Sequence, residues 1–346
     1  MKSAERENIV CTDFIPQKNW SFLDSLKSQT SEDWEAIGWR NNGLRKNRLS
    51  TIKRLFGYFS HSFGLFVHRG KYKSIVAWQQ FYGLLFAYYC LMFHVKKRTR
   101  LIILTFIFKE KPGILGKAYK SIITKIVRSE YVDRLVVYSQ TEMEYYAKKF
   151  DVEQSKFIYL PLGIDDKKDL GKTTVSLPKK FYLSVGRSNR DYDFLLNVAS
   201  SLPYPLVVLC DTIRQEILPD NVIFYNDIAG DEYLKILDEC EAVLIALNDP
   251  NISSGQLVML QAMQYKKPII ITEANSIRSY VKDGFNALIC RKDEAEFLKA
   301  VQRLNDNRGL YNDLIDNGYV EYLLKYSATA LGSNVGKAYL ECILEK

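Results

Sequence analysis

Short apolar runs alternate along the whole chain with stretches in which apolar residues recur every three or four positions. In the first half the apolar runs predict strands at 9–11, 36–39, 75–78, 101–108, 135–138 and 157–160. In the second half they predict strands at 181–185, 206–210, 222–224, 242–247, 269–272 and 287–290. Helices are expected between them at 114–128, 141–150, 192–200, 231–239 and 294–305. This alternation indicates an α/β fold with parallel sheets, which bind ligands at the carboxyl ends of their strands.

One polar stretch, 161–178, interrupts the alternation with the sequences D-D-K-K-D and G-K-T-T. A chain of 346 residues is also long for a single hydrophobic core. We therefore expect two domains, 1–165 and 166–327, with the polar stretch between them. A final helix at about 328–346 follows the second domain and is free to pack back onto the first.

Charge is distributed unevenly between the two halves. Residues 1–165 contain 27 Lys and Arg against 15 Asp and Glu, a net charge of +12, whereas residues 166–346 contain 21 against 25, a net charge of −4. No acid occurs at 36–109, where Phe, Tyr and Trp lie among the basic residues. Such a segment favours an anionic membrane surface or a lipid phosphate, or else is a solvated basic face. Nucleic acid is not an expected partner, because no nucleic-acid-binding motif is present.

The cysteines and the apolar runs bear on location. Six cysteines are scattered without a C-x-x-C pair, which is typical of reduced thiols in a cytoplasm and not of a disulfide framework or a zinc site. The start of the sequence lacks the pattern of a secretory signal, and the apolar run 81–93 is too short to span a bilayer. We expect a cytoplasmic protein, with peripheral contact at the inner face of the membrane as one alternative.

The segment that begins at Asn251 offers candidate chemistry. It reads N-I-S-S-G-Q-L-V-M-L-Q-A-M, so two serines and Gly255 open an apolar helix. The free N–H groups and positive dipole end of such a helix suit a phosphate. Gln261 lies two turns beyond Ser254 on the same face. The alternative is a capped helix packed on a sheet, and the segment alone leaves both interpretations open.

Four segments form a recognisable combination. A strand, Ser139, a helix and L-P-L-G-I-D lie within 136–165, and L-S-V-G-R-S-N-R-D-Y-D-F-L-L begins at Leu183. The helix described above and D-G-F-N-A-L-I, from Asp283, complete the set. Together they resemble GT-B glycosyltransferases, most closely family 4 (group 1) and relatives of bacterial polysaccharide biosynthesis. The resemblance covers most of 131–306. It implies two Rossmann-like domains facing a cleft, with the acceptor bound by 1–165 and the nucleotide-sugar donor by 166–327.

The resemblance also implies roles for individual residues in donor binding. The resemblance implies that the arginines after the strand at 181–185 bind the diphosphate. A glycine permits a tight turn there, and arginine forks can neutralise a leaving diphosphate without a metal. The resemblance further implies that the start of the helix binds phosphate or sugar and that Gln261 binds the ribose. The residue after the strand at 222–224 would then lie near the base. The implied donor-binding residues are Gly186, Arg187, Arg190, Asn226, Ser253, Ser254, Gly255, Gln256, Leu257 and Gln261.

The chain departs from this family at two positions. Family 4 enzymes commonly carry two glutamates eight positions apart in this helix segment, and Ser253 and Gln261 stand there instead. Gln261 can still hydrogen-bond ribose hydroxyls. A subgroup with altered donor choice and a binding subunit with a lost active site are both consistent with these replacements.

Candidate catalytic residues come from the first domain. Asp13 follows the first strand and is the best candidate for a base that deprotonates the acceptor hydroxyl, with Glu110 second. The alternative for Asp13 is a turn or helix cap ahead of Pro16. The histidines, among them His61 and His68 seven residues apart, suggest a surface role rather than a metal site.

These observations predict a hexosyltransferase that is independent of metals and of cofactors. It would move sugar from a nucleotide sugar, expected to be a UDP-sugar, to a saccharide or lipid-linked saccharide during bacterial surface polysaccharide synthesis. A non-catalytic sugar-nucleotide-binding partner subunit and a nucleotide-sugar epimerase are the alternatives. The epimerase interpretation is weakened by the scarcity of acids and histidines in the expected donor domain.

Overall fold

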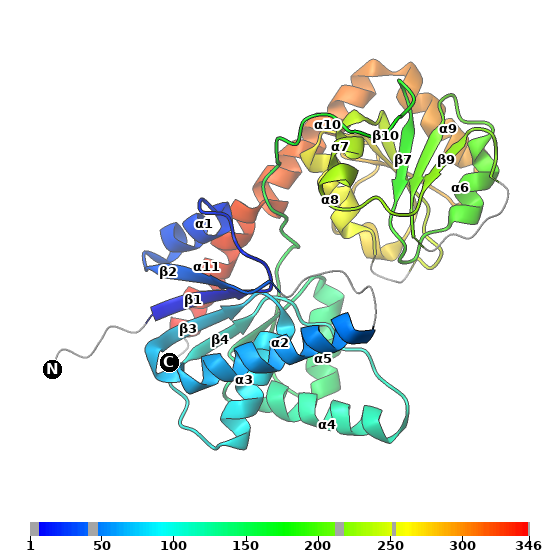
Figure 1. The fold of residues 1–346 in the computed structure, drawn as a ribbon. Coiled ribbons are helices and arrows are strands. Elements are labelled where there is room, and N and C mark those ends of the chain that lie inside the picture. Colours follow the sequence, from blue (N-terminus) through cyan, green and yellow to red (C-terminus); the bar gives the residue numbers. More distant parts are fainter. Residues whose placement is uncertain (1–6, 41–47, 212–217, 251–253, 345–346) are drawn as a thin grey trace. The chain divides into compact units, whose positions relative to one another are not determined.

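The chain divides into two compact units (Figure 1). The computed structural model describes residues 7–40, 48–211, 218–250 and 254–344. One unit comprises Met1–Pro161 with Ala328–Lys346, and the other comprises Leu162–Ser327. The division falls four residues before the expected boundary at 165, because Ile164 N–H donates to the Tyr326 carbonyl at 2.9 Å and so ties the start of this segment to the second unit.

The first unit is built on a parallel sheet with the strand order β2-β1-β3-β4-β5-β6. Its strands are β1 (Glu7–Thr12), β2 (Trp34–Gly38), β3 (Tyr72–Ala77), β4 (Arg100–Ile103), β5 (Arg134–Val137) and β6 (Phe157–Tyr159). Its helices are α1 (Ser21–Thr30), α2 (Arg48–Val67), α3 (Gln80–Met92), α4 (Gly113–Arg128), α5 (Gln140–Phe150) and α11 (Ala328–Leu344).

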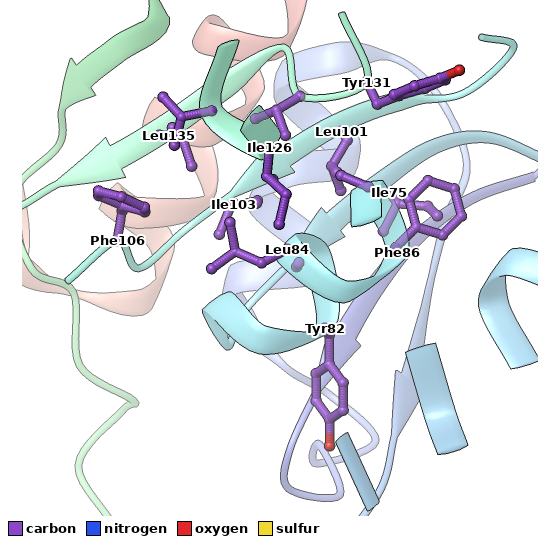
Figure 2. Packing of buried hydrophobic residues seen from close by; sticks show 14 of the residues in the cluster. Ile75, Tyr82, Leu84, Phe86, Leu101, Ile103, Phe106, Ile126, Tyr131 and Leu135 are labelled. Carbon is purple, nitrogen blue, oxygen red and sulfur yellow. The ribbon is translucent and has the colours of Figure 1, made fainter. Parts of the chain in front are cut away.

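Alternate residues of these strands enter two apolar layers. On one face Ile75, Leu101 and Ile103 pack against α2, α3, α4 and α5, and Figure 2 shows part of this layer, where Leu84 of α3 and Ile126 of α4 approach the sheet. On the other face Val10 and Val76, among others, pack against α1 and α11. The sheet is therefore covered by helices on both sides, as its nearly continuous apolar strands require.

The last helix completes the first unit. Ser25 Oγ of α1 donates to the Thr329 carbonyl at 2.7 Å, and the Tyr339 hydroxyl donates to Glu32 at 3.0 Å. Tyr339 is fully buried against Trp34, with ring centroids 5.1 Å apart. Residues near the end of the sequence thus form part of the layer that covers β1.

The second unit has a parallel sheet with the order β12-β11-β10-β7-β8-β9. Its strands are β7 (Tyr182–Val185), β8 (Leu206–Leu209), β9 (Val222–Tyr225), β10 (Ala242–Ile245), β11 (Ile269–Thr272) and β12 (Leu288–Cys290). Its helices are α6 (Tyr192–Ala199), α7 (Asp231–Glu239), α8 (Gln256–Gln264), α9 (Glu294–Asp306) and α10 (Arg308–Glu321), followed by the π-helix η4 (Tyr322–Tyr326). Apolar clusters fill both faces of this sheet.

The predicted strands are confirmed in order, although several end one or two residues early and one is much shorter than expected. The run 101–108 forms a strand only to Ile103. Beyond Ile103, the rings of Phe106 and Phe108 pack against Phe150 of α5. Their centroids lie 5.7 and 5.3 Å, respectively, from that of Phe150. Burial of aromatic rings makes this segment apolar without a strand ladder. Within the described part of the chain, no helix is both long and apolar enough to cross a membrane.

Candidate functional site

A sharp turn follows β7 at the carboxyl edge of the second sheet. Gly186 has φ 109°, a conformation that side chains rarely adopt, so the backbone can turn directly at the strand end. Arg190 then folds back under this turn and is only 8% exposed. Its Nε donates to the Val185 carbonyl and its Nη1 to the Ser188 carbonyl, both at 3.1 Å. The guanidinium is therefore held by backbone groups.

The Arg190 guanidinium lies between two glycines. A Cβ atom on Gly186 would lie 3.1 Å from Nη2, and one on Gly255 would lie 3.4 Å from Nη1. Gly255 is the N-cap of α8 and has φ 89°. Burial lowers the pKa of Arg190, which nevertheless stays a cation at neutral pH because free arginine titrates far above it. A buried cation beside the first turn of a helix is a strong anion-binding arrangement.

Asn189 joins the turn to the segment before α8. It adopts the left-handed conformation, with φ 56°. Its Nδ2 donates to the Asp249 carbonyl at 2.8 Å and to Ser254 Oγ at 3.1 Å, while its Oδ1 accepts from the Asp249 N–H at 2.8 Å. Asn189 was not among the residues expected from the sequence, although its side chain connects these two loops.

The expected phosphate-binding residues at the helix start have different exposures. Ser254 is buried, Gly255 and Gln256 are half-buried, and Leu257 is 52% exposed. Gly255 is the cap of α8 and lies next to Arg190, Gln256 and Leu257 begin the first turn, and Ser254 precedes the cap. Ser253 lies outside the described residues.

Arg187 and Asn226 lie further along the same edge. Arg187 is exposed and pairs with Asp211, which follows β8, at 2.9 Å between Nη1 and Oδ2. Asn226 is exposed just after β9, which is separated from β7 by β8. An anion that bound Arg187 would compete with Asp211, so Arg187 is a weaker anchor for the diphosphate than Arg190.

Gln261 has a partner that sequence analysis missed. The hydroxyl of Tyr233, on α7, donates to Gln261 Oε1 at 3.0 Å. Burial raises the pKa of Tyr233, so the phenol stays neutral. A glutamate here would bring a charge next to this buried phenol, whereas the amide of Gln261 accepts the same bond without one. Because Oε1 accepts this bond, the amide Nε2 of Gln261 is the group that can donate a hydrogen bond to a ligand hydroxyl.

The D-G-F-N-A-L segment has a structural role in the loop before β12. Asn286 is buried, accepts from the Lys282 N–H at 2.7 Å and donates to the Tyr280 carbonyl at 3.2 Å. Asp283 accepts from the Ile289 N–H at 2.8 Å. Asn286 thus satisfies backbone groups of its own loop, and Asp283 satisfies one of β12.

Asp13 lies at the carboxyl end of β1 in the first unit and is only 9% exposed. Burial is the main influence on this carboxyl and raises its pKa, against a backbone hydrogen bond and Arg54, which lower it. Arg54 Nη2 lies 3.9 Å from Asp13 Oδ2, and Arg54 Nε donates to the Tyr58 hydroxyl at 2.7 Å. A partly desolvated carboxylate with a raised pKa has the properties of a general base.

Aromatic rings surround this strand end. Phe14 contacts both Trp20 and Trp78 edge-on, with centroids 5.6 Å apart in each pair. Trp39, just after β2, stacks on the imidazole of His61 at 4.5 Å. Burial lowers the pKa of His61, which favours the neutral imidazole. Arg54, Tyr58 and His61 recur at helical spacing on α2, and this is the signal from which the cluster could have been found.

Glu110, the second candidate base, is in a different environment. It is exposed and lies between Lys120 and Lys149, with oxygen-to-nitrogen distances of 3.0 and 2.9 Å. Hydrogen bonds from these two lysines lower its pKa. Ion pairing makes Glu110 a poorer proton acceptor than Asp13. Among the described residues, no group of three or more His, Cys, Asp or Glu side chains is arranged to hold a metal ion.

Comparisons with known proteins bear on the second unit and on the fold. Residues 166–321 match the family model described as Glycosyl transferases group 1. Comparison with curated proteins gives no match.

Solved structures match over the whole chain. Sucrose-phosphate synthase from Thermosynechococcus elongatus has a TM-score of 0.65 at 14% identity, covering 99% of this chain and 100% of that one. HepE of Anabaena, in complex with UDP and glucose, has a TM-score of 0.63 at 12% identity, covering 97% and 100%. WaaG, a glycosyltransferase involved in lipopolysaccharide biosynthesis, has a TM-score of 0.56 at 10% identity, covering 95% and 98%. The fold is thus GT-B, as expected.

Proposed function

We propose that this protein transfers a sugar from a UDP-sugar to a saccharide or lipid-linked saccharide acceptor. The observation that carries the proposal is the Arg190 guanidinium held between Gly186 and Gly255 at the start of α8. A diphosphate leaving group gains negative charge as its bond to the sugar breaks. A fixed guanidinium and the amides of a helix start can stabilise that charge without a metal. The choice of UDP is supported by the structural similarity to HepE, solved with UDP and glucose.

In this proposal the acceptor hydroxyl attacks the anomeric carbon of the donor sugar, and the bond from that carbon to the diphosphate oxygen breaks. The electron pair leaves with the diphosphate, next to Arg190. Asp13 is the proposed base that takes the hydroxyl proton, because burial raises the pKa of this carboxyl. Gln261, oriented by Tyr233, is the proposed ribose contact.

The proposed setting is bacterial surface polysaccharide synthesis, on the cytoplasmic side of the membrane. The structural similarity to WaaG supports it, as does the net charge of +12 in residues 1–165, which suits a lipid-linked acceptor at an anionic surface.

The second candidate is a non-catalytic subunit that binds a sugar nucleotide. The observation that favours it is Gln261, which stands where relatives commonly carry a glutamate and is engaged by Tyr233. Such a subunit would bind donor but neither transfer nor hydrolyse it.

Thermal unfolding with a panel of nucleotide sugars tests the proposal. We expect one UDP-sugar to raise the Tm of the wild-type protein, because a ligand that binds only the folded state stabilises it. Arg190→Gln should abolish that shift, whereas Arg303→Ala, an exposed arginine on α9, should retain it. Donor hydrolysis with the same sugar then separates a transferase from a binding subunit. If no nucleotide sugar shifts the Tm, the proposal fails.

A further inference from the structure

Helix α2 carries an apolar face that is exposed to solvent. Seven apolar side chains of this helix are between 45% and 75% exposed: Leu49, Ile52, Leu55, Phe56, Phe59, Phe63 and Val67. At 100° per residue they fall within an arc of about 120° along the whole helix. Single exposed apolar residues are ordinary, but a continuous stripe of this kind marks an interaction surface.

The face that holds α2 in the fold lies mainly beside this stripe and overlaps it at Phe66. Tyr58, Leu65 and Phe66 are buried and pack in the layer shared with α3. The polar side of the helix is also exposed and includes Lys53 and Ser60. The helix therefore has a core face, an apolar solvent face and a polar solvent face, whereas packing on the sheet requires only the first.

The end of α3 extends the apolar surface, and α4 also exposes apolar residues. Met92 and Phe93, at the end of α3, are 47% and 52% exposed, and the Phe93 ring stacks on Phe66 of α2 at 5.2 Å. Ile114 and Leu115, in the first turn of α4, are 86% and 87% exposed. Figure 1 shows α2, α3 and α4 along one side of the unit. We call the exposed apolar residues of these three helices the α2–α4 face.

The charge around the α2–α4 face is almost entirely positive. Residues 48–129 contain 16 Lys and Arg and a single acid, Glu110. That acid is already paired with Lys120 and Lys149. Exposed bases on or near these helices in the sequence include Lys53, Lys96, Arg98, Lys111, Lys117 and Lys125.

We propose that the α2–α4 face docks on an anionic lipid bilayer, with α2 lying in the plane of the interface. An interfacial helix places its apolar side chains among the upper acyl chains while bases beside it meet anionic headgroups, and both parts are present here. A second copy of this chain is disfavoured as the occupant, because pairing two such faces would bring like charges together. Charge complementarity therefore selects the lipid surface.

The same helix connects this surface to the candidate base. Arg54, Tyr58 and His61 lie on the side of α2 away from the stripe, and Arg54 contacts Asp13. Docking would thus hold the acceptor-binding strand end close to the surface in which a lipid-linked acceptor resides. This purpose rests on the proposed function, whereas lipid binding itself is measured without donor or acceptor, so the two can fail separately.

Flotation of the full-length protein with vesicles tests the proposal. We expect binding to vesicles of equal parts phosphatidylcholine and phosphatidylglycerol, weaker binding to phosphatidylcholine alone, and loss at high salt. The variant Phe56→Gln/Phe59→Gln should lower the partition coefficient about tenfold or more, because two large side chains leave the acyl region. Both positions are exposed, at 72% and 50%, so folding should be retained.

A matched control comes from the second unit. Leu324 and Leu323 are 70% and 47% exposed, nearly the same as the two phenylalanines, and Leu323→Gln/Leu324→Gln should bind vesicles as the wild type does. The UDP-sugar Tm shift should be unchanged in both variants. The proposal is overturned if the wild type does not float with anionic vesicles or if both variants float equally. A third outcome would also overturn the proposal: the wild type dimerises but does not bind vesicles, and Phe56→Gln/Phe59→Gln no longer dimerises. The α2–α4 face would then bind a second copy of the chain.

Discussion

The carboxyl edges of the two sheets carry opposite chemistry. In the second unit a buried cation is fixed by backbone carbonyls and set between two glycines. In the first unit a buried carboxylate lies among aromatic rings, with one arginine 3.9 Å away. The first arrangement suits an anion of defined geometry, and the second suits a hydroxyl-bearing ligand with apolar faces. A site built from backbone leaves a motif of glycines in the sequence, whereas a site built from side chains of several strands does not.

Removal of the carboxylate should give the largest effect. Asp13→Asn keeps the shape of the side chain but cannot accept a proton as a carboxylate does, so kcat should fall about 10²–10⁴-fold. The Tm shift with UDP-sugar should stay, because Asp13 belongs to the other unit. An unchanged kcat would show that Asp13 is a turn residue and that the base lies elsewhere.

The cation should matter for both binding and rate. Arg190→Gln should lower kcat/KM about 10²–10³-fold. The variant loses a charged hydrogen-bonding group that faces the negative charge developing on the leaving diphosphate. Arg187→Gln should cost less, because Arg187 is exposed and already paired with Asp211. Steady-state kinetics of the two variants decide the order, and equal losses would contradict the distinction drawn between the two arginines.

Acidification should affect the two edges differently. Because burial raises the pKa of Asp13, this carboxylate gains its proton at a higher pH than an ordinary aspartate. A base works only when deprotonated, so kcat should fall as the pH drops through that pKa, by about tenfold per pH unit below it. Arg190 remains charged throughout this range. Donor affinity should hence persist where turnover has fallen, and a parallel loss of both in a pH titration would argue against Asp13 as the base.

The smallest effect should come from the glycine at the helix cap. Gly255→Ala places a Cβ 3.4 Å from Arg190 and strains a backbone with φ 89°. We expect donor affinity to fall about threefold to tenfold, measured as the Kd for UDP-sugar, because strain at the helix cap displaces the first turn of α8 from its place beside Arg190. Gly230→Ala, at φ 65° with open space around it, controls for strain alone.

The sequence predicted most of the strands because alternating apolar runs specify buried parallel sheets. The family resemblance grouped Gly186, Arg190 and Gly255 as donor-binding residues, and in the structure these three lie together. The pairs Arg187–Asp211 and Tyr233–Gln261 were not predicted, because each joins side chains more than twenty residues apart without a local pattern. The stripe on α2 was missed for another reason: its periodicity is that of any packed helix, and only measured exposure distinguishes it.

The return of α11 to the first unit has a consequence for synthesis. The second unit is one uninterrupted segment, Leu162–Ser327, and can fold as soon as it has emerged from the ribosome. The first unit begins earlier but needs Leu331, Val335 and Tyr339 to cover one side of its sheet. Order of completion is therefore the reverse of order of translation, and nascent chains that stop before α11 should expose an uncovered β-sheet surface to chaperones and proteases.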